Sequence, residues 1–333
     1  MKMKVLRTPE TSFADIKDYP FEPHYTNVMT EDGATIRIHH IDEGPSDGPA
    51  VLCLHGQPVW SYLFRKMIPY LTGAGLRVIC PDLVGFGKTD KPAAREDYSY
   101  ERQVEWMGAW LEQNDFTALT FFGQDWGGLI GLRLVAAHST RFDRVVISNT
   151  GLPYNPNVPQ EQVAQVEAYR ASASTPTLFD MAKEIGRLSW ETKTANPARV
   201  FAVWQKFCWE NENMPIGFMM SMMMEKTAKP LQALKFLMHS LGMYSPLPTS
   251  LAKAYDAPFP DPSYKMGPRA MPSHVPTLPT SPSLAEQKKA WDFFEKFEKG
   301  TLNHTPMADP FDQDLRNLLI ENAAGLKLKC HSN

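Results

Sequence analysis

The turn Gly123-Gln124-Asp125-Trp126-Gly127-Gly128 constrains this chain more than any other segment. The apolar run before it is typical of a buried strand, and the apolar residues spaced over 129–135 predict a helix after it. The chain must therefore reverse within a few residues, with Asp125 at the tip. Gly123 and Gly127, two positions to either side, let the strand and the helix approach closely. We predict a sharp strand-turn-helix unit that exposes Asp125, although glycine-flanked aspartates also occur in ordinary turns.

A carboxylate at the tip of such a turn can act as a nucleophile unaided. It is ionised at neutral pH, whereas a hydroxyl needs a neighbouring base before it can attack. Attack by Asp125 on a saturated carbon with a good leaving group would give an alkyl ester, which water must then cleave. Carbon-halogen bonds and epoxide carbons are the electrophiles that suit this chemistry.

A second motif lies upstream, where the apolar run 50–54 ends in His55-Gly56-Gln57-Pro58. The pattern predicts a strand, a glycine turn and a helix. In enzymes with a nucleophile turn of this kind, the loop after such a strand supplies one backbone N–H of an oxyanion hole, and the residue after the nucleophile supplies the other. We therefore predict that the backbone amides of Gln57 and Trp126 form this hole. His55 is interpreted as a structural residue that hydrogen-bonds to the backbone.

Strands and helices alternate through most of the chain, which predicts a mostly parallel sheet with right-handed crossovers. Functional side chains then collect at the carboxyl ends of the strands, where both Asp125 and Gln57 fall. The last predicted helix carries Trp291, Phe294 and Phe297 as its buried stripe. The predicted elements are an antiparallel pair at 27–29 and 35–42, a strand at 144–148, and helices at 100–112 and 285–299.

These motifs, in their order and spacing, resemble the haloalkane dehalogenases of the α/β-hydrolase superfamily. Segments 55–65 and 124–128 carry most of the resemblance, which is close over 27–153 and resumes over 201–276. Among relatives, the chain most resembles the branch that holds halide with two tryptophans. The resemblance implies an α/β-hydrolase fold, which is a doubly wound, mostly parallel sheet with an inserted helical cap. It divides the chain into a first core part at 1–153, a cap at 154–255 and a second core part at 256–333.

The resemblance also implies roles for single residues. Asp125 would be the nucleophile, and Trp126 one halide donor, because an indole N–H is a neutral hydrogen-bond donor. Trp204 in the cap would be the second donor, with Trp209 as the alternative, although a tryptophan on an amphipathic helix can also simply fill the core. Asp309 falls in the register of the family's triad acid, although an exposed turn aspartate would give the same local pattern.

The end of the chain departs from the family pattern. Segment 300–305 is a poor strand at a place where the family has a hydrophobic one, and neither His304 nor His331 stands in the Gly-His context of the family's general base. The triad histidine is therefore unknown, and the last strand and helix of the core are expected to be missing. Without a base, the alkyl ester on Asp125 should accumulate.

The implied activity is hydrolysis of a small halogenated alkane by water, which releases an alcohol and a halide ion. Two alternatives remain open. An epoxide hydrolase would need cap tyrosines that protonate the epoxide oxygen, and an inactive α/β-hydrolase-fold binding protein would keep the pocket without turnover. The tyrosines available for the first alternative are Tyr154, Tyr169, Tyr244 and Tyr255.

Composition adds several expectations. A net charge of −3 and a pI near 6.3 leave no electrostatic footprint for nucleic acid. No apolar run is long enough to span a membrane, and no signal-peptide core follows the first residues, so we expect a cytoplasmic protein. The histidines and cysteines lack metal-ligand spacing, and all four cysteines, Cys53, Cys80, Cys208 and Cys330, are expected as free thiols. We expect a monomer without metal or organic cofactor.

Overall fold

The computed structural model describes residues 2–181, 183–184, 197–224, 238, 249–297 and 300–304. Its centre is a seven-stranded sheet with the strand order β2-β3-β5-β4-β7-β8-β9. The strands β2 and β3 form the antiparallel edge, β3 also pairs antiparallel with β5, and all the remaining pairs are parallel. The strand bounds are β2 His24–Met29, β3 Thr35–Glu43, β4 Ala50–Leu54, β5 Arg77–Pro81, β7 Leu119–Gln124, β8 Phe142–Ser148 and β9 Gly300–His304. A small second sheet pairs β1 (Val5–Leu6) with β6 (Lys91–Pro92).

The register of the sheet brings the two predicted motifs together. Strands β4 and β7 are parallel neighbours, and Leu54 is paired with Gly123. The loops that follow these two strands therefore leave the sheet side by side, at its carboxyl edge. One loop carries Gln57 and the other carries Asp125, so the sheet places the predicted oxyanion loop beside the predicted nucleophile.

Three long helices pack beside the sheet, as alternation of strands and helices predicts. The helix α3 (Trp126–Ala137) contacts β7, α2 (Tyr100–Gln113) and α11 (Leu284–Phe294), while the short α1 (Ile68–Gly73) contacts β5. Apolar side chains on these helices and on the sheet form one continuous core. The 3-10 helices are η1 Glu10–Phe13, η2 Ser61–Phe64, η3 Arg95–Asp97, η4 Ser139–Arg141, η5 Pro262–Lys265 and η6 Met271–His274.

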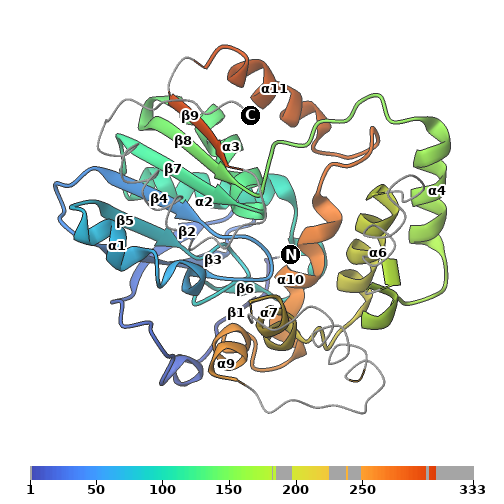
Figure 1. Ribbon diagram of the computed structural model, residues 1–333, viewed down its shortest axis with the longest axis horizontal. Coiled ribbons are helices and arrows are strands. Elements are labelled where there is room, and N and C mark those ends of the chain that lie inside the picture. Colours follow the sequence, from blue (N-terminus) through green and yellow to red (C-terminus); the bar gives the residue numbers. More distant parts are fainter. Residues whose placement is uncertain are drawn as a thin grey trace.

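A second group of helices lies to one side of the sheet. Figure 1 shows α4 and α6 on the right, α7 and α9 below, and α10 in the centre between them and the sheet. The bounds are α4 Gln160–Ala171, α6 Pro197–Glu210, α7 Ile216–Met224, α9 Ser250–Asp256 and α10 Met266–Ala270. Helix α10 and the following η6 both contact α6, so this short segment joins the helical group to the rest of the molecule.

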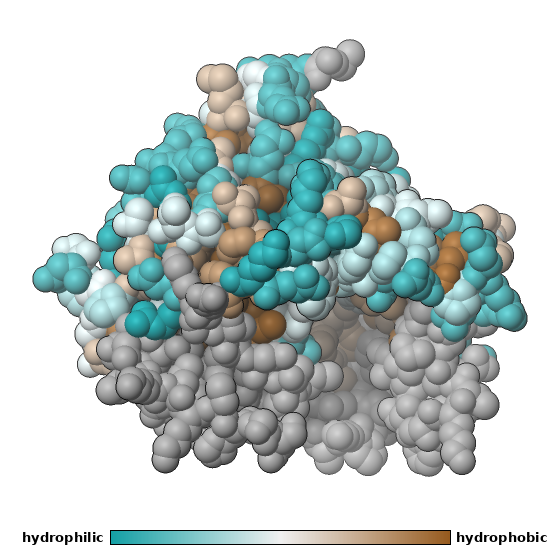
Figure 2. All heavy atoms as spheres, turned by 90° about the horizontal axis from the view of Figure 1, so that it is seen from above, coloured by the Kyte–Doolittle hydropathy of each residue, from teal (hydrophilic) through white to brown (hydrophobic). Residues whose placement is uncertain are grey.

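The described helices and one face of the surface can be compared with what a membrane crossing or an apolar patch requires. None of the helices in the described ranges combines the length and apolar character that a bilayer crossing requires. Seen from above, the coloured part of the surface is mostly hydrophilic, with apolar residues in small scattered groups (Figure 2). Scattered apolar residues of this kind are normal on protein surfaces.

Two details differ from the sequence predictions. Segment 300–304 was expected to be a poor strand, yet it forms β9, which pairs in parallel with all of Arg144 to Ser148. Backbone hydrogen bonding to an existing strand edge can compensate for weak local strand propensity. Trp291 is 41% exposed instead of buried, and its indole N–H donates to the carbonyl oxygen of Leu152 at 2.8 Å. The polar Gln287 occupies a buried position of α11 instead.

Candidate active site

Asp125 lies between β7 and α3 in a strained backbone conformation. Its φ of 51° and ψ of −128° are unusual for a residue with a side chain. Glycine is required on either side of Asp125, because neighbouring atoms leave no room for a side chain. A Cβ on Gly127 would lie 2.1 Å from the carbonyl oxygen of Leu54, and one on Gly123 would lie 2.8 Å from the Cα of Gly128. The predicted sharp turn, with small residues two positions to either side of Asp125, is confirmed.

The Asp125 carboxylate accepts hydrogen bonds from two backbone amides. The amide of Gln57 donates to Oδ1 at 2.7 Å, and the amide of Trp126 also hydrogen-bonds to the carboxylate. Burial raises the pKa of Asp125 from 3.8 to about 6, and the two amides oppose this shift because they stabilise the ionised form. The two amides that the sequence analysis selected thus converge on one carboxylate.

His55 fixes the peptide that carries the Gln57 amide. Its Nε2 accepts the N–H of Leu83 at 2.9 Å, so the ring proton is on Nδ1, which donates to the carbonyl oxygen of Gly56 at 2.8 Å. Burial lowers the pKa of His55, which keeps the ring neutral in this tautomer. The Gly56 carbonyl and the Gln57 N–H belong to one peptide plane, so His55 orients the donor that reaches Asp125. This agrees with its interpretation as a structural residue.

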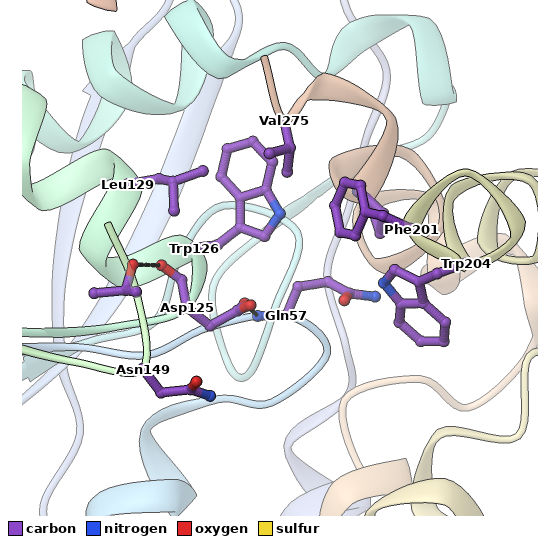
Figure 3. A pocket seen from close by; sticks show the side chains of 10 residues that line it. Gln57, Asp125, Trp126, Leu129, Asn149, Phe201, Trp204 and Val275 are labelled. Carbon is purple, nitrogen blue, oxygen red and sulfur yellow. Dashed lines mark hydrogen bonds between the residues drawn. The ribbon is translucent and has the colours of Figure 1, made fainter. Parts of the chain in front are cut away.

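A cavity of about 180 Å³ opens above the Asp125 carboxylate. Among the described residues that line it, Asp125 is the only ionisable one. Most of the others are apolar or aromatic, so charge that develops in the cavity meets little water. The lining residues are Gln57, Asp125, Trp126, Leu129, Asn149, Thr150, Phe201, Trp204, Pro272 and Val275 (Figure 3).

Two indoles stand on opposite sides of this cavity. Trp126 is only 3% exposed, and its ring packs edge-on against Tyr100 with a centroid distance of 5.2 Å. Trp204 comes from α6, where its ring stacks on Phe207. In Figure 3 the indole nitrogens of Trp126 and Trp204 face each other across the cavity. An apolar cavity with two neutral N–H donors and one carboxylate can hold a neutral molecule whose leaving group becomes an anion.

Trp209, the alternative to Trp204, is not among the described residues that line the cavity. Its carbonyl oxygen instead accepts a hydrogen bond from Arg269 at 3.1 Å and another from Arg95 at 2.5 Å. The guanidinium of Arg95 also lies over the Trp209 ring, 4.4 Å from its centroid. Trp209 therefore anchors the end of α6, whereas Trp204 faces the cavity.

The predicted triad residues cannot be compared with this geometry. Asp309 and His331 lie outside the described residues, and only the backbone of His304 is described, at the end of β9. Cys53, Cys80 and Cys208 are buried free thiols. Within the described ranges, no group of three His, Cys, Asp or Glu side chains is arranged to hold a metal ion.

Sequence reasoning missed several residues of the cavity wall. Asn149 follows directly after β8, the neighbour of β7, so the rule that sites gather at strand ends could have singled it out. Its φ of 48° marks a second strained position beside Asp125. Leu129, Phe201 and Val275 had no comparable signal, because an apolar residue that lines a cavity has the same local pattern as one that fills the core.

Known proteins resemble this chain over nearly its whole length. A family model described as the alpha/beta hydrolase fold matches residues 49–184. A haloalkane dehalogenase of Psychrobacter cryohalolentis is 38% identical over 99% of this chain and 90% of its own length. One of Mycolicibacterium paratuberculosis is 36% identical over 99% of this chain and 91% of its own length. The chain belongs to the haloalkane dehalogenase family.

Solved structures of haloalkane dehalogenases share its fold. DpaA of Paraglaciecola agarilytica superimposes with a TM-score of 0.64 at 24% identity, over 97% of this chain and 96% of that one. DatA of Agrobacterium tumefaciens superimposes with a TM-score of 0.52 at 20% identity, over 94% of this chain and 89% of that one. The α/β-hydrolase fold and the family that the motifs around Gln57 and Asp125 predict are thus confirmed.

Proposed function

We propose that this haloalkane dehalogenase cleaves the carbon-halogen bond of a small halogenated alkane, with Asp125 as the nucleophile. One observation carries the proposal: the Asp125 carboxylate lies at the base of a cavity walled by two indoles that face each other. A raised pKa of about 6 still leaves Asp125 mostly ionised at neutral pH. Partial desolvation makes such a carboxylate a stronger nucleophile than one in water.

In the first step, a carboxylate oxygen of Asp125 forms a bond to the carbon while the carbon-halogen bond breaks. The halide leaves with the bonding electron pair, and an alkyl ester of Asp125 remains. The indole N–H groups of Trp126 and Trp204 stabilise the departing anion, because they are neutral donors in apolar surroundings. No proton has to move in this step.

In the second step, water attacks the ester carbonyl and releases the alcohol, a proton and the free carboxylate. The amides of Gln57 and Trp126 already hydrogen-bond to the Asp125 carboxylate, which supports their role as an oxyanion hole for the tetrahedral intermediate. A base must activate the water, and no histidine is assigned to this task. Asp309 remains our candidate for the acid that would orient such a base.

The alternative of epoxide hydrolysis finds less support. It needs a phenol that points into the cavity, yet none of the described residues lining it is a tyrosine. Tyr255 is fully buried and Tyr169 packs among apolar residues of α4 and α6, while Tyr244 lies outside the described residues. A binding protein without turnover remains a second alternative, because the base is unassigned.

Intact-mass spectrometry after incubation with 1,2-dibromoethane tests the proposal. We expect either a bromoethyl adduct that maps to Asp125 or steady release of bromide, depending on how fast the ester is hydrolysed. Asp125→Asn is the matched control, because it keeps the size of the side chain and removes the charge; it should give neither. Wild-type protein that forms no adduct and releases no bromide, but opens styrene oxide, would favour the epoxide alternative.

We further propose that residues 154–255 act as the cap over this cavity and that the protein is a monomer. The position of α4 and α6 beside the sheet supports the first point (Figure 1). The solved structure of DpaA is tetrameric. The number of subunits of this protein must therefore be measured. Light scattering coupled to size-exclusion chromatography would give the mass in solution.

A further inference from the structure

Tyr100, the first residue of α2, contacts the first turn of α3 in two ways. Its ring packs edge-on against the indole of Trp126, with a centroid distance of 5.2 Å and an angle of 84° between the ring planes. Its hydroxyl donates to the carbonyl oxygen of Leu129 at 2.5 Å. Trp126 and Leu129 both line the cavity, whereas Tyr100 is not among the described residues that do. Tyr100 therefore supports the cavity wall from behind.

The Tyr100 ring is itself held by its surroundings. It is fully buried, and burial raises the pKa of its hydroxyl, which therefore stays protonated and remains a donor. The guanidinium of Arg133 on α3 lies over the ring, 5.2 Å from its centroid. Arg133 is only 9% exposed and donates to Oε1 of Gln287 on α11 at 3.3 Å. The helices α2, α3 and α11 thus meet around this ring.

The orientation of the Trp126 indole depends on such packing. Its N–H is the only hydrogen-bond donor of the side chain, and it faces the cavity (Figure 3). Because that N–H has to be free to bind a halide, packing must set the orientation of the ring. Edge-to-face pairs of aromatic rings have a preferred geometry, so the Tyr100 ring restricts rotation of the indole.

We infer that Tyr100 is a positioning residue that aims the indole N–H of Trp126 at the departing halide. The inference rests on the proposed function, since it assigns this N–H to the halide. A hydrogen bond weakens steeply as its angle departs from linearity. Rotation of the indole therefore lowers the affinity for halide and slows cleavage of the carbon-halogen bond. Loss of the Tyr100 ring allows that rotation.

Tyr98 provides a matched control two residues away. It is also fully buried, and its hydroxyl donates to the carbonyl oxygen of Pro92 at 3.0 Å. Its ring packs edge-on against Trp106, with a centroid distance of 6.4 Å and an angle of 84°. Neither Tyr98 nor Trp106 is among the described residues that line the cavity. Tyr98→Leu therefore removes the same kinds of contact as Tyr100→Leu without touching a halide donor.

The test is a titration of the full-length protein with bromide, followed by isothermal calorimetry. We expect Tyr100→Leu to weaken the affinity for bromide about three- to tenfold, within the range that loss of one aromatic pair gives. Tyr100→Phe keeps the ring and should change the affinity less than about twofold. Tyr98→Leu should lower stability in urea but change the affinity less than about twofold. Equal weakening of bromide binding by both leucine variants would overturn the inference.

NMR spectra of protein with isotope-labelled tryptophan identify the indole that is affected. The indole N–H peaks of Trp126 and Trp204 are assigned by their loss in Trp126→Phe and Trp204→Phe. Bromide should shift both peaks in the wild type. In Tyr100→Leu at saturating bromide, the shift of the Trp126 peak should shrink while that of the Trp204 peak is retained. A full shift of the Trp126 peak in this variant would show that the indole needs no support from Tyr100.

Two further variants keep the test decisive. If Tyr100→Leu does not fold, Tyr100→Met removes the ring and fills the gap with a flexible side chain, and the same losses are expected. In the Trp126→Phe background, Tyr100→Leu should weaken bromide binding no further, because the N–H that Tyr100 aims is already absent. A further loss in that background would mean that Tyr100 only supports the cavity wall in general.

Failure of the proposed function has a different signature. If wild-type protein binds no bromide and forms no ester on Asp125, the function itself is wrong. If wild-type protein binds bromide and Trp126→Phe weakens that binding, while Tyr100→Leu leaves it unchanged, only the positioning role of Tyr100 is wrong.

Discussion

The backbone amide of Gln57 lies 2.7 Å from Oδ1 of Asp125, although the two residues are 68 positions apart in the chain. The pairing of β4 with β7 brings their loops together, and His55 turns the intervening peptide so that its N–H faces the carboxylate. Two opposing effects meet at this carboxylate. Burial raises its pKa, and the amides of Gln57 and Trp126 lower it. The result is a carboxylate that is ionised at neutral pH and still poorly hydrated.

The rate of Asp125 alkylation should depend on pH with a midpoint near 6. Only the ionised carboxylate attacks, and burial raises its pKa to about 6, so the rate should fall roughly tenfold per pH unit well below that value. Formation of the bromoethyl adduct, followed by quenched-flow mass spectrometry between pH 4.5 and 8, gives this profile. A rate that stays constant down to pH 4.5 would contradict the raised pKa.

Asp125→Asn should stabilise the folded protein at pH 8 and not at pH 4. Burial raises the pKa of Asp125 in the folded protein above 3.8, so the folded protein binds this proton more tightly than the unfolded chain does. The resulting contribution to the free energy of unfolding is complete below pH 3.8 and is lost as the pH rises through about 6. At pH 8 the ionised side chain then costs up to about 3 kcal/mol, which an amide avoids. Urea unfolding of both proteins at the two pH values measures this difference. An equal gain at both pH values would point to another cause.

Gly56→Ala should disable the proposed site because it displaces Asp125. A Cβ at this position would lie 2.4 Å from both the Cβ and Oδ1 of Asp125, so one of the two loops must shift. A shift of about 1 Å at a reacting atom can slow attack about a hundredfold. Adduct formation with 1,2-dibromoethane measures the rate. Gly73→Ala is the control, since a Cβ there meets nothing within 4 Å, and this variant should react like the wild type.

The sequence allowed prediction of the nucleophile turn because its requirement is local. Gly123 and Gly127 are needed for close packing within a few residues, and the apolar runs of β4 and β7 are long enough to identify as strands. The relative placement of Asp125 and Gln57 followed from the general rule for parallel sheets. No longer-range information was needed for this half of the site.

The remaining parts depend on tertiary contacts that no local pattern encodes. The residues of β9 are weak strand formers, and this strand forms because it pairs in parallel with the edge of β8. Periodicity places Trp291 in the core, whereas in the structure it is 41% exposed and its indole N–H donates to the Leu152 carbonyl. The selection of Trp204 over Trp209 depended on the family resemblance, since both lie on α6 and only the path of the helix decides which one faces the cavity.

Trp204→Phe should weaken halide binding, and Trp209→Phe should not. Phenylalanine keeps the aromatic packing on Phe207 but removes the only hydrogen-bond donor of the side chain. Loss of one donor to an anion in apolar surroundings corresponds to about tenfold or more in affinity. Bromide titrations followed by isothermal calorimetry avoid the loss of fluorescence signal in these variants. Equal weakening in both variants would mean that Trp204 supports the helix instead of the halide.

Lys91 provides a prediction that is independent of the reaction. Its side chain is fully buried and donates to the carbonyl oxygens of Gly87 and Thr89, at 2.8 and 2.9 Å. Burial lowers its pKa from 10.5 to about 7, although the nearby Asp82 and Asp90 oppose the shift. The unfolded chain therefore binds more protons than the folded protein between about pH 7 and 10.5, and stability should increase with pH across this range.

Lys91→Met should remove this increase, because methionine fills a similar volume and does not titrate. Urea unfolding at pH 7 and pH 9.5 gives the slope for each protein, and the difference between wild type and variant isolates the contribution of Lys91. The control is Lys289→Met, since the Lys289 side chain is 72% exposed and the substitution should leave the slope unchanged. A slope that persists in Lys91→Met would mean that the buried ammonium keeps its proton throughout, held by the two carbonyl oxygens and the neighbouring carboxylates.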